Sequence, residues 1–331
     1  MTAATLPDDQ RLIDISPKAY EHPADRAATA ALKSIPMLDT VVRKLIEYGY
    51  ERAFQQLLLA NAVRLSDEQL PSVWQEHRAA LARLDIKEVP ELYLAQMPFI
   101  NAMAVGSQRP MVVLHSGTVN ALEETELRTV LGHEAAHILS DHVLYATALA
   151  ILLSIPGRLP LMAGLPLLAV KLALLEWYRA AELSCDRAAT LVNRSPMTTC
   201  QTLMVIAGGA ASRKLSLDAF VRQAQEYEEW EPGWEKMARF GQTLFETHDY
   251  PVKRVSELMK WVRSGDYDRI MSGEYRKRGE PVNPRDEASD ATEYYAERFR
   301  TLFRDFGEGV SKTGEKVSGA ADKLSEWLRN R

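Results

Sequence analysis

The chain has 331 residues, of which 46% are hydrophobic and 26% are charged. This is the composition of a globular protein with enough length for one large core or two small ones. The net charge of −5, without a basic stripe carrying interleaved aromatic residues, argues against nucleic acid as a partner. The two cysteines, Cys185 and Cys200, have neither zinc-ribbon nor CxxC spacing, so we expect small core residues in a reducing compartment.

Residues 1–30 are polar and rich in alanine and proline, and we expect an N-terminal extension that packs loosely. Residues 1–20 carry neither a basic segment nor an apolar segment behind it, which argues against a secretory signal peptide. We therefore expect a cytoplasmic protein, with association at a membrane as the alternative.

Between residues 36 and 114, apolar residues occur first at helical spacing and then in short continuous runs. These patterns predict two helices and two strands: helices over Pro36–Val63 and Ser66–Leu84, and strands at Glu91–Leu94 and Met111–Leu114. Asn120 and Glu123 have the spacing of a capping box, which would open the following helix.

The most specific pattern in the chain is the HExxH motif of His133, Glu134 and His137. Because a helix repeats every 3.6 residues, the two histidines share one face and can bind one tetrahedral metal ion. Glu134 then lies to the side, where it can hold and deprotonate a water at the metal. The alternative is a chance match on an ordinary helix, but apolar neighbours such as Val130 and Ile138 make an unpartnered histidine pair costly.

A tetrahedral zinc bound by two histidines and a water needs one more protein ligand. The metzincin choice is a histidine ten residues after the first, and Val143 stands there instead. A helix predicted over Trp177–Asn193 offers Glu182 and Asp186, which are four apart and share one face. Spacing alone does not choose between these two carboxylates, and an ordinary surface ion pair with Arg179 remains the alternative.

The HExxH motif, an apolar insert and the later sequence RxxExxCDxxA resemble one zinc metallopeptidase family. That family comprises the HtpX-type heat-shock proteases, the CAAX prenyl endopeptidases and the Oma-type mitochondrial proteases. Cys185 stands where the family usually has alanine. The stretch 101–117 is similar to the family's NAFA…G region. Residues 247–254 resemble its THP…R element, with Asp249 and Tyr250 separating His248 from the proline.

This resemblance implies one zinc ion per chain, held by His133, His137 and Glu182, with Glu134 as general base. Asp186 would orient a histidine ligand through its second ring nitrogen. The implied fold is mainly α, of α+β type: a zincin-like gluzincin metallopeptidase with a small sheet beside the HExxH helix.

We therefore expect a zinc-dependent endopeptidase that acts on polypeptide substrates, in protein quality control at or near a membrane. The strand around Val113 would pair with the substrate main chain by strand addition, and Asn101 would brace that edge. His248 or Tyr250 would donate a hydrogen bond to the developing oxyanion. The alternative is a non-catalytic, zinc-stabilised interaction protein, against which Glu134 argues because closed structural zinc sites need no general base.

The segment Val143–Leu175 carries only two charges, Arg158 and Lys171, and prolines and glycines interrupt it. It is too interrupted for a clean membrane span, so two readings stay open: a buried helical hairpin, and a hairpin that dips into a membrane. We expect a metallopeptidase domain over residues 31–263, with this insert at 143–175. Residues 264–331 would form a charged linker and a C-terminal helical tail, which either packs back on the domain or binds a partner or membrane. The sequence leaves the oligomeric state open.

Overall fold

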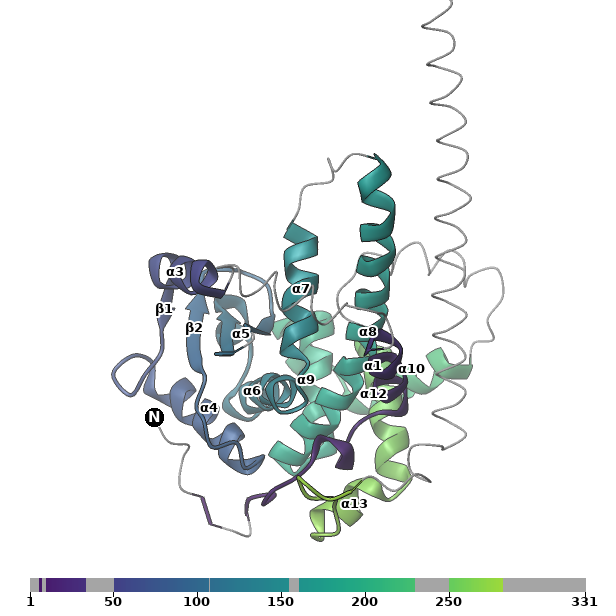
Figure 1. The fold of residues 1–331 in the computed structure, drawn as a ribbon. Helices are drawn as coiled ribbons and strands as arrows, with labels where there is room; N and C mark the ends of the chain where they lie inside the picture. Colours follow the sequence, from purple (N-terminus) through teal and green to yellow (C-terminus); the bar gives the residue numbers. More distant parts are fainter. Residues whose placement is uncertain are drawn as a thin grey trace, which may run out of the picture.

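The computed structural model describes residues 6–7, 10–33, 51–106, 108–154, 161–229 and 250–281. The first elements are η2 (Pro17–Ala19), α1 (Pro23–Lys33), α3 (Glu51–Asn61), β1 (Ala62–Arg64), α4 (Pro71–Arg83), β2 (Glu91–Ala95), β3 (Ala102–Val105), β4 (Met111–His115) and α5 (Ser116–Ala121). The later elements are α6 (Glu124–Leu139), α7 (Val143–Ser154), α8 (Leu161–Asn193), α9 (Pro196–Gly208), η4 (Ala210–Lys214), α10 (Leu217–Glu229), α12 (Pro251–Arg263) and α13 (Asp266–Met271). Helices dominate, and one small sheet lies beside them (Figure 1), which confirms the predicted mainly α class.

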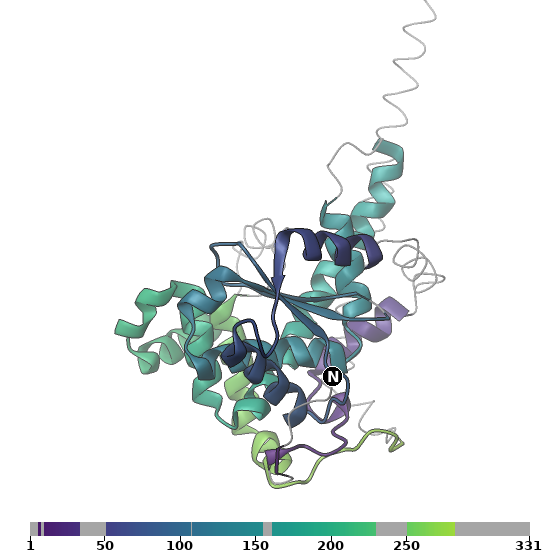
Figure 2. The same ribbon diagram turned by 90° about the vertical axis from the view of Figure 1, so that its left-hand side faces the viewer.

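The sheet has the strand order β1-β2-β4-β3 and is mixed. Figure 2 shows it beside the helices in a second view. β2 runs parallel to β4, whereas β3 is antiparallel to β4, with Met103 opposite Val113. Every residue of β4 is buried, as expected for a central strand covered on both faces. Among the described strands, β1 and β3 are therefore the two edges.

The two predicted strands are confirmed within β2 and β4, and the predicted second helix within α4. The first predicted helix is wrong at its end, because Ala62–Arg64 pairs with β2 as a strand. Strand pairing here overrides the local helical pattern. Residues 36–50 of that prediction lie outside the described residues. Strand β3 was not predicted, since its four residues are too few to show a period.

The HExxH helix, α6, begins at a capping box, although not the predicted one. Glu123 is the N-cap, and its backbone N–H donates to the Glu126 carboxylate at 2.9 Å. Asn120 instead belongs to the short preceding helix α5. The box is shifted by three residues because the chain forms α5 directly after β4, which delays the start of α6.

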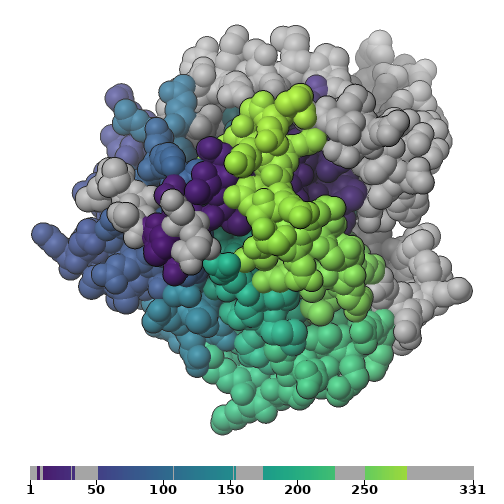
Figure 3. Space-filling view, turned by 90° about the horizontal axis from the view of Figure 1, so that it is seen from below, coloured from purple at the N-terminus to yellow at the C-terminus, as the bar shows by residue number. Residues whose placement is uncertain are grey.

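The N-terminal segment does not pack loosely, contrary to the prediction. Small residues of α1, such as Ala27 and Ala28, are buried against α7 and α8. Ile15 forms a β-bridge with Lys277, so residues near the two ends of the described chain lie side by side, purple beside yellow-green in Figure 3. The alanines that suggested a loose extension form instead a smooth helix face that packs closely.

The chain continues past the predicted domain end at residue 263 as part of the same body. Helix α13 buries Tyr267 and Ile270, and the ring of Tyr267 contacts Trp261 of α12 at 5.8 Å between centroids. The predicted tail helices fall within residues 282–331, which lie outside the described residues.

Helices α7 and α8 form the predicted hairpin, which extends beyond the rest of the described body in Figure 1. Its base is core: Leu144, Tyr145 and Leu149 of α7 cluster with Leu174 and Trp177 of α8 and with the alanines of α1. No helix among the described residues combines the length and the apolarity that crossing a membrane requires.

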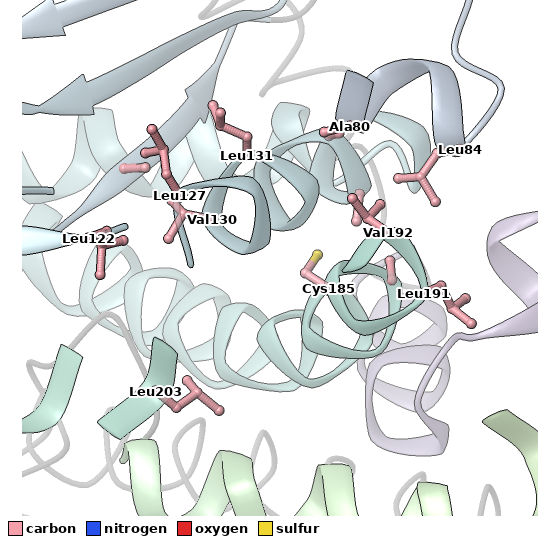
Figure 4. Close-up of a cluster of buried hydrophobic side chains, with 14 of the residues drawn as sticks. Ala80, Leu84, Leu122, Leu127, Val130, Leu131, Cys185, Leu191, Val192 and Leu203 are labelled. Atoms are coloured by element: carbon pink, nitrogen blue, oxygen red, sulfur yellow. The ribbon is translucent and has the colours of Figure 1, made fainter. Parts of the chain in front are cut away.

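Helices α6 and α8 cross at the centre of the main core, with Leu127, Val130 and Leu131 on one helix and Cys185, Leu191 and Val192 on the other (Figure 4). Gly132 permits this contact, because a Cβ atom there would lie 3.0 Å from the Cβ of Val192. The close approach brings the next residue, His133, against α8.

Candidate metal centre

Three buried side chains from α6 and α8 point their donor atoms at one another. The Nε2 atoms of His133 and His137 lie 3.2 Å apart. The Oε1 atom of Glu182 lies 3.4 Å from His133 Nε2 and 3.2 Å from His137 Nε2. The structure thus brings together the two histidines of the HExxH motif and the first of the two candidate carboxylates.

The triangle of donor atoms has the size of one face of a tetrahedral zinc site. Bonds of about 2.0–2.1 Å in tetrahedral geometry separate ligand atoms by about 3.3–3.4 Å. Two imidazoles and a carboxylate are also a donor set that catalytic zinc accepts, with the fourth position left for water or substrate. The residues present therefore fit a zinc ion.

Cys185 is a further candidate ligand, since its Sγ and nitrogen atoms of His133 and His137 all lie within 4.8 Å of one another. Burial, together with the carboxylates of Glu182 and Asp25, raises the pKa of this thiol well above its ordinary value. Its Sγ lies 3.7 Å from His142 Nδ1, whereas Glu182 Oε1 lies 3.4 and 3.2 Å from the two Nε2 atoms, so we favour Glu182 over Cys185.

The second carboxylate, Asp186, faces the outer side of a histidine, with Oδ1 3.2 Å from His133 Nδ1. Arg254 of α12 donates from Nε and Nη2 to Asp186, at 2.7 and 2.6 Å. Its Nη1 lies 3.1 Å from Glu182 Oε2. One guanidinium therefore pairs with two carboxylates that are buried together. Although burial alone would raise it, Arg254 holds the pKa of Asp186 below its ordinary value.

Sequence reasoning had assigned Arg254 only to a resembling element and had given it no role. The alternative reading of the sequence, an ion pair of Arg179 with Glu182, is not what the structure shows, because Arg179 donates to Glu176 on the same helix at 3.1 Å. The signal for Arg254 was its place in the THP…R resemblance, but only the tertiary structure shows that α12 returns to the metal centre.

The two carboxylates decide which histidine is protonated. Burial disfavours a charged ring at His133, but Glu182 and Asp186 outweigh it and raise the pKa of His133 to about 10. Burial, opposed by Glu182 and reinforced by the charge on His133, lowers the pKa of His137 to about 4. The two carboxylates therefore favour the positively charged form of His133, and a metal ion bound at Nε2 would take the place of that proton.

A cavity of about 420 Å³ opens beside these side chains. Glu134, the predicted general base, lines it together with Asn101 and Tyr250. Its apolar wall comes from α6, α9 and the residues before β3, namely Val130, Leu203, Ile206, Phe99 and Ile100. His248, the other predicted oxyanion donor, lies outside the described residues.

The predicted substrate strand around Val113 is contradicted by the sheet order. Val113 lies in β4, whose two edges are already paired with β2 and β3. Asn101 does brace a strand, but that strand is β3: its side-chain Oδ1 accepts the backbone N–H of Ala102 at 2.9 Å. The sequence could not order the strands, because β3 was not predicted.

Two side chains that contact His137, Tyr178 and His142, were not predicted from the sequence. The ring of Tyr178 stacks on that of His137, with centroids 5.4 Å apart and planes 6° from parallel. On the other side His142 Nδ1 lies 3.3 Å from His137 Nδ1, and His142 Nε2 lies 3.2 Å from Asp25 Oδ2. His142 stands one residue before the position of the third metzincin histidine, and nothing in the sequence linked either His142 or Asp25 to the motif.

The chain is similar in sequence to known metallopeptidases. The family model described as peptidase family M48 matches residues 65–262. A plastoglobule-localized metallopeptidase 48, chloroplastic, of Arabidopsis thaliana is 32% identical over 271 residues, which are 80% of this chain and 78% of that protein. A protease HtpX homolog of Burkholderia ambifaria is 24% identical over 246 residues, 64% of this chain and 81% of that protein. No solved structure matches the chain.

Proposed function

Because the chain belongs to peptidase family M48 and is a metalloprotease, we propose that it is a zinc-dependent endopeptidase with a zincin-like, gluzincin fold. The observation that carries the proposal is the triangle of buried donor atoms on His133, His137 and Glu182, whose edges of 3.2, 3.2 and 3.4 Å suit zinc. A buried Glu134 beside an open cavity favours this enzyme over a non-catalytic protein that uses the metal for stability.

His133, His137 and Glu182 would hold the metal. When bound, zinc supplies a Lewis acid that polarises the scissile carbonyl and lowers the pKa of water. Glu134 follows His133 on α6 and lines the same cavity, so its carboxylate is placed to accept the proton of the attacking water. It then returns that proton to the leaving amine. Asp186 and Arg254 hold the ring of His133 and the carboxylate of Glu182 in place.

An extended substrate would pair with the edge strand β3, because β4 has no open edge. This places the main chain of the substrate beside Asn101 and next to the cavity. The apolar wall from Val130, Leu203 and Ile206 suits an apolar substrate side chain. Tyr250 lines the same cavity, and we assign its hydroxyl to the developing oxyanion.

Two further observations favour unfolded polypeptides as substrates and a membrane as a contact surface. The resemblance to HtpX-type heat-shock proteases favours unfolded polypeptides as substrates, in quality control. The apolar hairpin extends beyond the body in Figure 1, which favours a membrane contact through its distal part, beyond the buried base at Leu144 and Trp177.

The test is cleavage of an unfolded polypeptide by purified protein, first as isolated, then after a zinc chelator, and then after zinc is added back. We expect cleavage at internal bonds, its loss with the chelator and its return with zinc. Internal cleavage separates an endopeptidase from an exopeptidase. Cleavage that survives complete removal of the metal would overturn the proposal.

A further inference from the structure

We propose that Asp25, on the N-terminal helix α1, is a positioning residue that fixes the metal ligand His137 through His142. The proposal rests on the proposed function, since it takes His137 as a ligand through Nε2. It concerns a part of the chain that the family match, residues 65–262, does not include.

The connection is a continuous row of buried contacts. His137 Nδ1 lies 3.3 Å from His142 Nδ1, and His142 Nε2 lies 3.2 Å from Asp25 Oδ2. Asp25 is completely buried, and two hydroxyls hold it: Ser184 donates to Oδ2 at 2.6 Å and Thr29 donates to Oδ1 at 3.1 Å. The carboxylate is therefore fixed from α1 itself and from the metal-bearing helix α8.

The proton positions follow from the chemistry of each group. A neutral histidine that offers Nε2 to a metal carries its proton on Nδ1, so His137 must donate to His142. His142 Nδ1 then accepts, and its own proton sits on Nε2. Asp25 is a carboxylate and can only accept, which selects this tautomer of His142. The proton on His137 Nδ1 is thus accepted by His142, and the proton on His142 Nε2 is accepted by the carboxylate of Asp25, which Ser184 and Thr29 hold in place.

The two histidine ligands are thus held in different ways. His133 meets its carboxylate, Asp186, directly at 3.2 Å, whereas His137 reaches its carboxylate, Asp25, through His142. Tyr178 stacks on the face of the His137 ring and sets its plane, which leaves rotation within that plane to be fixed by His142. Residues that hydrogen-bond the second ring nitrogen of a metal-binding histidine strengthen metal binding, because they orient the ring toward the metal.

The test measures the zinc dissociation constant of Asp25→Asn in competition with a chromophoric chelator. We expect binding about 10–100-fold weaker than in the wild type, the usual effect of losing an outer partner. Asp85→Asn is the matched control. Asp85 is also a buried carboxylate that ties down the N-terminal segment, but it does so through Arg11 and the Asp14 N–H, apart from the histidines. We expect its zinc affinity to equal that of the wild type.

His142→Gln and the double variant Asp25→Asn/His142→Gln show whether Asp25 acts through His142. Residues that act through one contact are not additive, so the double variant should bind zinc no more weakly than either single one. The visible spectrum of the Co²⁺ forms should change in the same way in all three, as a change in ligand orientation requires. If Asp25→Asn does not fold, Thr29→Val replaces it. This change keeps the carboxylate and removes the Thr29 hydroxyl, which donates to Asp25 and accepts the indole N–H of Trp177; we then expect several-fold weaker binding.

Wild-type zinc affinity in Asp25→Asn, or in Thr29→Val where that variant replaces it, would overturn the inference. Additive losses in the double variant would overturn it as well. Failure of the proposed function looks different, since in that case the wild-type protein would still cleave after complete removal of its metal.

Discussion

Glu182 and Asp186 lie on one face of α8, and only their distances to the histidines separate their roles. Glu182 Oε1 lies near both Nε2 atoms, whereas Asp186 Oδ1 lies near the outer nitrogen of His133. We predict that Glu182→Ala loses zinc, while Asp186→Asn keeps it with about 10–100-fold weaker binding. Zinc stoichiometry after dialysis measures both. Full zinc in Glu182→Ala with none in Asp186→Asn would reverse the two roles.

The residues of the metal centre differ in how far the sequence could predict them. Helical periodicity places His133 and His137 on one face without any tertiary information. It cannot separate Glu182 from Asp186, because both occupy the same face of a later helix. Asp25 and Arg254 come from α1 and α12, and their approach depends on packing that no local pattern encodes.

His77 predicts how stability depends on pH. It is fully buried on α4, with Nε2 3.1 Å from the carbonyl oxygen of Pro90, and burial lowers its pKa from 6.5 to about 4. Below pH 6.5 the unfolded chain binds a proton that the folded chain does not, so stability falls as the pH drops. The loss grows by roughly 1.4 kcal/mol per pH unit and reaches about 3 kcal/mol near pH 4.

His77→Gln keeps a donor for the Pro90 carbonyl but does not titrate. The free energy of unfolding, measured with denaturant on metal-free protein from pH 7 to pH 4, should therefore fall less steeply in the variant. Equal slopes in the two proteins would show that His77 is not held neutral.

At the scale of elements, the crossing of α6 and α8 brings the two halves of the metal centre together. Gly132→Ala places a methyl group 3.0 Å from the branched Cβ of Val192. Alanine at an ordinary helical position stabilises by up to about 1 kcal/mol relative to glycine. Here we predict the opposite, a lower melting temperature and weaker zinc binding, because α8 has to move away from α6.

The second change Val192→Gly makes room for the added methyl group, because it removes the Cβ of Val192 together with both Cγ atoms. We expect Gly132→Ala/Val192→Gly to bind zinc more tightly than Gly132→Ala alone, although the loss of the valine side chain and the new glycine within α8 lower its stability. A Gly132→Ala variant that is more stable than the wild type and binds zinc normally would contradict the close approach.

The sequence predicted those helices and strands that show a local pattern. It did not predict strands that form only because they pair with a neighbouring strand. β2 and β4 were predicted from short apolar runs. Ala62–Arg64 follows a helical pattern in sequence but pairs with β2, and the short β3 becomes a strand through its partner β4. Missing β3 made β4 look like an edge, which is why the substrate strand was assigned to Val113.

At the scale of the whole molecule, the N-terminal segment crosses from the C-terminal residues to the hairpin base. Ile15 pairs with Lys277, Tyr20 hydrogen-bonds Ser140 at the end of α6, and Trp177 of α8 donates to Thr29. The segment therefore contacts the back of the metal centre and the base of the hairpin together. Its composition alone suggested the reverse, because small and polar residues are common both in loose extensions and in close helix contacts.

The hairpin gives a prediction at the same scale. We expect the wild-type protein to sediment with lipid vesicles. Replacing Leu161, Leu167 and Leu168 by serine should release it into the supernatant with its zinc retained. The control replaces Met197 and Leu215, which are exposed on the body, and should still sediment. If the hairpin were core throughout, the triple variant would unfold and lose zinc, since large-to-small core changes cost about 2–5 kcal/mol each.

The central claim is that His133, His137 and Glu182 hold a zinc ion while Glu134 moves the proton. The most direct measurement determines zinc content and cleavage of an unfolded polypeptide on one preparation each of wild type and Glu134→Gln. The amide has the size of the carboxylate but cannot accept the proton of water. We predict one zinc per chain in both proteins and loss of nearly all cleavage in the variant. Cleavage by Glu134→Gln at the wild-type rate would contradict the account.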